Sequence, residues 1–118
     1  MDLALTVEAV GPGAVLYCDG RIVCGPHIDL LVRRCGELLE VYPVIGLDMS
    51  GVTAVDSVGL GSLVRVLASA RKRGKDLVII SPSERASQAL RLAKLLAVFP
   101  HFNSVQEFYM PGTRAVIA

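Results

Sequence analysis

Residues 56–61, Asp-Ser-Val-Gly-Leu-Gly, combine residue types that could bind an anion or receive the backbone of a partner protein. They follow a short apolar stretch and precede a segment with helical spacing, so Asp56 and Ser57 are expected at a helix N-terminus. Unpaired N–H groups and the positive end of the helix dipole favour a phosphate there. Gly59 and Gly61 would leave no side chain in the way of an approaching backbone. The simpler alternative is that Asp56 or Ser57 only caps the helix and the glycines only allow close packing.

The remaining residues do not indicate an enzyme, and we expect no catalytic site. Ser57 has no identifiable base to activate it, and His101 lies between Pro100 and Phe102 without a neighbouring carboxylate in the sequence. The Gly59-x-Gly61 pattern lacks the third glycine of a dinucleotide-binding loop, and the chain has no phosphate-binding loop of the GxxxxGK type. We therefore expect no cofactor.

Cys24, His27 and Cys35 are the residues most able to form a metal site. Their spacing is incomplete, and Cys35 falls on the face of a predicted helix that should be buried, so we expect no metal. With Cys18 they make three cysteines, an odd number without paired spacing. The N-terminus begins acidic and has no signal-peptide pattern, so the thiols are expected to be reduced and mostly buried in a cytosolic (cytoplasmic) protein.

The 118 residues suffice for one domain, predicted over residues 1–118. A net charge of +1, no tryptophan and no basic run longer than residues 71–73 argue against nucleic acid. No run is long enough to insert in a membrane. The 53% hydrophobic content and mean hydropathy of +0.54 are high, so either several segments are covered on both faces or an apolar patch faces a partner.

Two strands should open the chain as an antiparallel hairpin. Leu3–Val10 alternates apolar and polar residues, as expected for the first strand. Residues 11–13 should form a turn, and residues 14–18 should form the second strand. Residues 19–21, Asp-Gly-Arg, indicate a turn or a bulge. A first helix then begins at Gly25-Pro26 and ends at Tyr42-Pro43. Its buried positions should be Ile28, Leu31, Val32, Cys35, Leu38 and Leu39.

The middle of the chain should form a buried strand over residues 44–49, the turn described above, and a helix. From residue 60 to Gly74 the helical period places four apolar residues on one face: Leu60, Leu63, Val64 and Leu67. Asp76–Ile80 follows as a short strand of the parallel type.

A third helix should start at a capping box in which Ser81 is the N-cap, Pro82 the first residue and Glu84 the reciprocal partner. It is expected to bury Ala86, Ala89, Leu90 and Ala93. A short extended piece is expected at residues 97–99, then a helix from a second capping box at residues 104–107, cut short at Pro111-Gly112. Residues 112–118 would be a tail.

Strands alternating with helices after a hairpin predict an α/β fold with a mixed, mostly parallel sheet covered by helices.

Residues 44–81, VIGLDMSGVTAVDSVGLGSLVRVLASARKRGKDLVIIS, resemble the central motif of the STAS domain family, named for sulfate transporters and anti-sigma factor antagonists. The matching features are Leu47-Asp48, Val52, the Asp56-Ser57-x-Gly59-Leu60-Gly61 turn, and the helix leading to Gly74. Residues 20–23 and 95–108 resemble stand-alone bacterial members more weakly. The similarity in the order of elements runs from about Leu3 to Phe108.

The resemblance implies a stand-alone anti-sigma factor antagonist that regulates transcription. Such members bind an anti-sigma factor of the serine kinase type, whose cofactor is ATP, and so release a sigma factor. The kinase ends the interaction by phosphorylating a serine in the turn, usually the second serine of Asp-Ser-Ser-Gly. Here Val58 occupies that position and Ser57 the one before it. Either the switch has moved to Ser57, or, as we favour, phosphorylation does not regulate this protein.

The partner-binding surface is expected to comprise the turn, the exposed side of the helix that it starts, and loop residues near Gly25. Its members are Asp56, Ser57, Val58, Gly59, Leu60, Gly61, Ser62 and Arg65. Two alternatives stay open: a scaffold or adaptor subunit of a signalling or transporter assembly, and a sensor of a small ligand or nucleotide that uses the same turn. Self-association into a homodimer also stays open.

Overall fold

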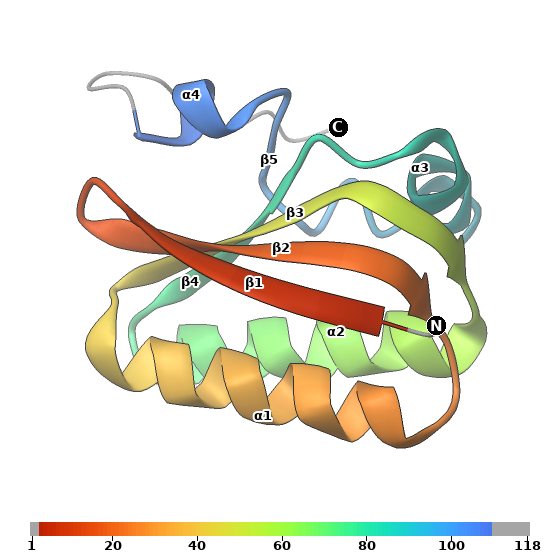
Figure 1. Ribbon diagram of the computed structural model, residues 1–118, viewed down its shortest axis with the longest axis horizontal. Helices are drawn as coiled ribbons and strands as arrows, with labels where there is room; N and C mark the ends of the chain where they lie inside the picture. Colours follow the sequence, from red (N-terminus) through yellow and green to blue (C-terminus); the bar gives the residue numbers. More distant parts are fainter. Residues whose placement is uncertain (1–2, 110–118) are drawn as a thin grey trace.

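A five-stranded sheet with the strand order β1-β2-β3-β4-β5 forms the centre of the computed structural model, which describes residues 3–109 (Figure 1). The elements along the chain are β1 (Leu3–Val10), β2 (Gly13–Ile22), α1 (Pro26–Val41), β3 (Val44–Val55), α2 (Ser57–Lys72), β4 (Asp76–Ile80), α3 (Glu84–Leu92), β5 (His101–Phe102) and α4 (Val105–Tyr109). β1 and β2 pair antiparallel, and the pairs β2–β3, β3–β4 and β4–β5 are parallel. This confirms the predicted mixed, mostly parallel α/β sheet with an opening hairpin.

Both central strands are longer than the sequence suggested. β2 does not stop at residue 18, and the predicted turn over residues 19–21 is wrong, because these residues stay paired with β3. The register shifts between Tyr17 and Asp19 and again between Gly20 and Arg21, so the alternative of a bulge is confirmed. β3 likewise continues to Val55 instead of ending at residue 49. Each strand is extended because the other supplies its hydrogen-bond partners.

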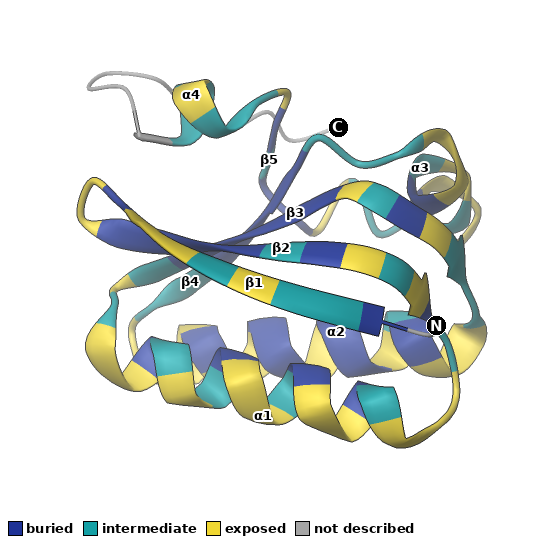
Figure 2. Cartoon of the chain, in the orientation of Figure 1, coloured by how far each residue is buried: buried dark blue, intermediate teal, exposed yellow. Residues whose placement is uncertain are grey.

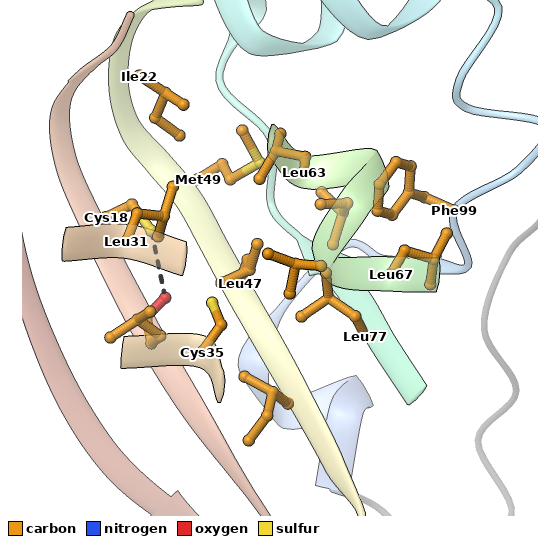
Figure 3. Packing of buried hydrophobic residues seen from close by; sticks show 14 of the residues in the cluster. Cys18, Ile22, Leu31, Cys35, Leu47, Met49, Leu63, Leu67, Leu77 and Phe99 are labelled. Carbon is orange, nitrogen blue, oxygen red and sulfur yellow. Dashed lines mark hydrogen bonds between the residues drawn. The ribbon is translucent and has the colours of Figure 1, made fainter. Parts of the chain in front are cut away.

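Helices α1 and α2 lie side by side on one face of the sheet, and Figure 2 shows exposed residues along the outer side of α1. α1 starts with Pro26 as its first residue and ends where Tyr42 turns extended, as predicted. Its buried residues are Ile28, Leu31, Cys35 and Leu39. They pack with side chains of the sheet and of α2, including Leu47, Met49, Leu63 and Leu67 (Figure 3).

α2 begins at Ser57, directly after its N-cap Asp56, as the residues of the turn predicted, and ends with Lys72. Gly74 follows with a φ of 74°, a left-handed conformation that favours glycine, and Lys75 N donates to Ala70 O over 2.8 Å. The predicted burial of Val64 is wrong, because 37% of its surface is exposed. Val66 is buried instead, so the buried face is rotated relative to the predicted one.

The N-cap of α3 is Ser83, and the prediction of Ser81 is wrong. Ser83 Oγ accepts a hydrogen bond from Ala86 N over 3.1 Å and donates one to Val52 O over 2.6 Å, so it also fixes α3 to β3. Ser81 has a φ of 46° and lies in the loop after β4. Of the residues expected to be buried on this helix, Ala86 and Leu90 are buried, Ala89 is half-buried, and Ala93 is exposed.

The last described strand is β5 at His101–Phe102, so the extended piece predicted at residues 97–99 is wrong. α4 follows and packs on the opposite face of the sheet from α1 and α2, where Phe102 and Phe108 meet edge to face. Ser104 Oγ accepts a hydrogen bond from Glu107 N, as the predicted capping box requires. The carboxylate of Glu107, however, accepts from Asn103 N and not from Ser104 N, so the reciprocal bond is displaced by one residue.

The predicted helix end at Pro111-Gly112 and the tail over residues 112–118 lie outside the described residues. No helix within residues 3–109 has the length and apolar character needed to cross a membrane.

Candidate functional site

The turn between β3 and α2 is held at one end of the sheet by the extension of β2 and β3. β4 pairs with β3 only as far as Asp48, whereas β2 stays paired until Ile22 lies opposite Val55. One residue further, Asp56 N donates to Ile22 O over 3.3 Å. The turn is therefore tied to a neighbouring strand, although it lies beyond the end of β4.

Asp56 connects three segments of the chain. Its Oδ1 accepts a hydrogen bond from Gly59 N over 2.8 Å, which caps α2, and its Oδ2 accepts one from Cys24 N over 2.9 Å in the loop before α1. The hydrogen bond from Cys24 N, followed by that from Gly59 N, lowers the pKa of this carboxyl from its ordinary value. The carboxylate is therefore ionised at neutral pH, and of Asp56 and Ser57 it is Asp56 that caps α2.

Gly59 and Gly61 differ in burial, although both were expected to leave room for a partner's backbone. Gly59 is buried, and a β-carbon there would overlap the carbonyl group of Ile22. The expectation that Gly59 leaves room for a partner is therefore wrong, because β2 already occupies that space. Gly61 is exposed, and a β-carbon there would meet nothing within 4 Å. Of the two glycines, Gly61 faces open space.

Ser62 was expected on the exposed side of α2, and this placement is wrong. Only 2% of its surface is exposed, and its hydroxyl donates to Gly59 O over 2.7 Å inside the first turns of the helix. Spacing alone could not reveal this, since a serine can be buried when its hydroxyl bonds to the backbone of its own helix.

The other predicted residues of the turn lie at the start of α2, whereas Arg65 lies further along the helix, beside a hollow between α1 and α2. Val58 is 47% exposed, and Ser57, Gly61 and Arg65 are also exposed. Leu60 is half-buried against the main core. The turn thus presents a serine, an apolar side chain and bare backbone, and Asp56 and Gly59 hold these residues in place from beneath.

A hollow of about 510 Å³ borders this surface on the side of α3, and the sequence analysis missed it. Its walls include Asp56, Ser57 and Leu60 from the turn, with Arg85 and Leu92 from α3. Leu92 is 86% exposed. Leu92 follows Leu90, so a helical projection of α3 could have shown that these two leucines cannot both face the core.

The model of the STAS domain matches residues 6–108. This chain belongs to the STAS domain family. The turn at Asp56–Gly61 is thus the strand-to-helix turn of a STAS domain, as its residues suggested.

The proteins that resemble this STAS domain include relatives and solved structures named as anti-sigma factor antagonists. An anti-sigma-B factor antagonist of Listeria monocytogenes is 31% identical over 83 residues, covering 58% of this chain and 73% of that protein. A Thermotoga maritima protein assigned to the anti-sigma factor antagonists is 30% identical over 66 residues, covering 56% of this chain and 58% of that protein, less than two thirds of its length. The fold matches the anti-sigma factor antagonist SpoIIAA in its unphosphorylated form, with a TM-score of 0.73, 12% identity and coverage of 89% and 93%.

The cysteines of the STAS domain lie in two different environments. Cys18 and Cys35 are buried, close to one another in the core (Figure 3), and Cys24 is exposed. Burial raises the pKa of Cys35 to about 12 and raises that of Cys18 as well, so both thiols stay protonated at neutral pH. Among residues 3–109, no group of three or more His, Cys, Asp or Glu side chains could hold a metal ion.

Proposed function

We propose that this STAS domain is an anti-sigma factor antagonist, which binds an anti-sigma factor and thereby releases a sigma factor. The family match over residues 6–108, together with the names of the relatives, carries this proposal. The protein would act by binding and not by catalysis, because the turn offers no nucleophile with an adjacent base.

The geometry of the turn supports a role in docking. Asp56 and Gly59 fix the backbone at the start of α2 through contacts with Cys24 and Ile22. A surface that is already ordered loses little conformational entropy when a partner binds. The binding surface would comprise Ser57, Val58 and Gly61 with the half-buried Leu60 and the exposed Arg65.

The partner would be an anti-sigma factor of the serine kinase type, which binds its own ATP. Val58 occupies the position at which such a kinase modifies its antagonist, and valine has no hydroxyl to receive a phosphate. Ser57 is an exposed residue, but a phosphate there would lie next to the ionised carboxylate of Asp56. We infer that this antagonist binds its partner without the usual phosphorylation switch.

An affinity pull-down from the native cytosol, followed by mass spectrometry, tests this proposal. Recovery of a kinase-type anti-sigma factor, with or without added ATP, is the expected result. A bait with Gly61→Gln serves as the comparison, because it alters the exposed turn without filling any occupied space. Recovery of transporter subunits or of a large signalling assembly in place of an anti-sigma factor would overturn the proposal and support a scaffold.

A further inference from the structure

A second hollow, of about 390 Å³, lies where β4 and β5 end. Five polar residues line it: Ser81, Ser87, Arg91, His101 and Asn103. None of them borders the hollow beside Asp56, so this is a separate feature of the molecule. The carboxyl ends of parallel strands are the usual location of ligand sites in open α/β sheets, and this volume is within the range of small-molecule sites.

The walls of this hollow are tied together by hydrogen bonds. Ser81 N donates to Phe102 O over 2.9 Å, and Ser81 Oγ donates to Asn103 O over 2.6 Å. These bonds join the loop after β4 to the loop after β5, two segments that end at the same edge of the sheet (Figure 1). The chain then continues from Ser81 into α3, which contributes Ser87 and Arg91. The polar groups are therefore held in place by three segments.

Two of these side chains are not engaged by the protein. His101 Nδ1 is buried and has no hydrogen-bond partner among the described residues. A buried polar atom without a partner is unfavourable, so it is commonly satisfied by a bound molecule or a water. The guanidinium group of Arg91 likewise forms no hydrogen bond or ion pair within residues 3–109. The carboxylate of Glu107, near the loop after β5, does have a partner in the protein, because it accepts a hydrogen bond from Asn103 N.

We propose that this hollow binds a small phosphorylated molecule through its phosphoryl group. The planar fork of Arg91 would bind two of the phosphoryl oxygens, and the imidazole of His101 would donate to a third. The hydroxyl of Ser87 already donates to Pro82 O over 3.4 Å. Arg91 belongs to α3 and His101 to β5, so the donors would reach the phosphoryl group from two segments of the chain. The STAS domain would then sense a phosphorylated metabolite at a site distinct from its partner-binding turn.

Titration of the isotope-labelled protein with inorganic phosphate at constant ionic strength, followed by NMR, tests this site. Saturable shifts are expected for the backbone amides of Ser87 and Asn103 and for the imidazole C–H signals of His101. The signals of His27, which borders a different hollow, should not move. Arg91→Gln should weaken phosphate binding on the order of tenfold, as expected for loss of a charge-assisted hydrogen bond. Arg85→Gln, on the same helix, is the matched control and should leave binding unchanged.

The proposal is overturned if the shifts do not saturate, if they centre on residues 57–61, or if Arg91→Gln binds phosphate as well as the wild type. Acetate binding as tightly as phosphate would also overturn it, since a carboxylate would then suffice. The spectrum of Arg91→Gln without phosphate shows whether the variant is folded, and an exposed arginine without a partner should be replaceable without loss of structure. None of these results depends on whether the protein binds an anti-sigma factor.

Discussion

Gly59, in the first turn of α2, packs directly against the carbonyl group of Ile22, at the end of β2. A β-carbon at Gly59 would overlap the carbonyl oxygen and lie 2.9 Å from the carbonyl carbon. The same carbonyl oxygen accepts the hydrogen bond from Asp56 N, so it cannot move aside without loss of that bond. This contact determines how closely α2 approaches the sheet and where the exposed residues of the turn lie.

Gly59→Ala should therefore destabilise the fold. Insertion of a methyl group into a filled space typically costs about 1–3 kcal/mol. Gly61→Ala is the matched control: a β-carbon there meets nothing, and alanine in a helix is more stable than glycine by about 0.5–1 kcal/mol. Urea unfolding of the two variants checks both effects. Equal stability of the two variants would show that Gly59 is not constrained by Ile22.

Asp56→Asn should lower the melting temperature at neutral pH. The carboxylate accepts two N–H groups, from Cys24 and Gly59, whereas an asparagine side chain offers a single acceptor oxygen and would turn an NH₂ group toward one of them. Glu40→Gln, at an exposed position near the end of α1, is the control for removal of a surface negative charge.

The stability difference between wild type and Asp56→Asn should also depend on pH in a defined direction. The pKa of Asp56 is lowered in the folded protein, so its stabilising effect is present above the pKa of the unfolded chain, about 3.9. It is lost as the pH falls through the lower folded pKa. Melting curves of both proteins should therefore differ from pH 7 down to about pH 4 and converge below it. A difference in melting temperature that increases toward acidic pH would contradict a lowered pKa for Asp56.

Val58→Ser should restore a phosphorylation site if the partner is a serine kinase of the expected type. Val58 is 47% exposed at the start of α2, where a phosphate is favoured by the helix dipole. Incubation with the partner and ATP should phosphorylate this variant, as measured by mass spectrometry, and the modified protein should bind the partner more weakly. Val64→Ser, at a 37% exposed position on the same helix, should remain unmodified. Failure to modify Val58→Ser by a kinase-type partner would refute the inferred correspondence of positions.

The parts of the fold that the sequence predicted well are those with local signals. The period of apolar residues, Pro26 at the start and Tyr42 at the end located α1, and the apolar run at Asp76–Ile80 located β4. The Asp-Ser-x-Gly-Leu-Gly pattern located the turn because capping residues and glycines are concentrated there.

The features that the sequence did not predict depend on contacts between distant segments. β2 and β3 are extended through residues 19–21 and 50–55 because they pair with each other. Ser83 caps α3, and not Ser81, because its hydroxyl also reaches Val52 O. Gly59 is buried because Ile22 lies above it, whereas Gly61, two residues later, is open. No local pattern could separate the two glycines, so the candidate surface became defined only in three dimensions.

The affinity of the recovered anti-sigma factor for wild type and for two glutamine variants shows whether the β3–α2 turn is the docking surface. Gly61→Gln places a side chain on the exposed turn, and Gly36→Gln places one at a helical position of α1 where a β-carbon also meets nothing. Calorimetric titration should show binding lost or reduced more than tenfold by Gly61→Gln, about 1.4 kcal/mol or more, and unchanged by Gly36→Gln. Equal affinity of all three proteins would contradict the assignment of the β3–α2 turn as the docking surface.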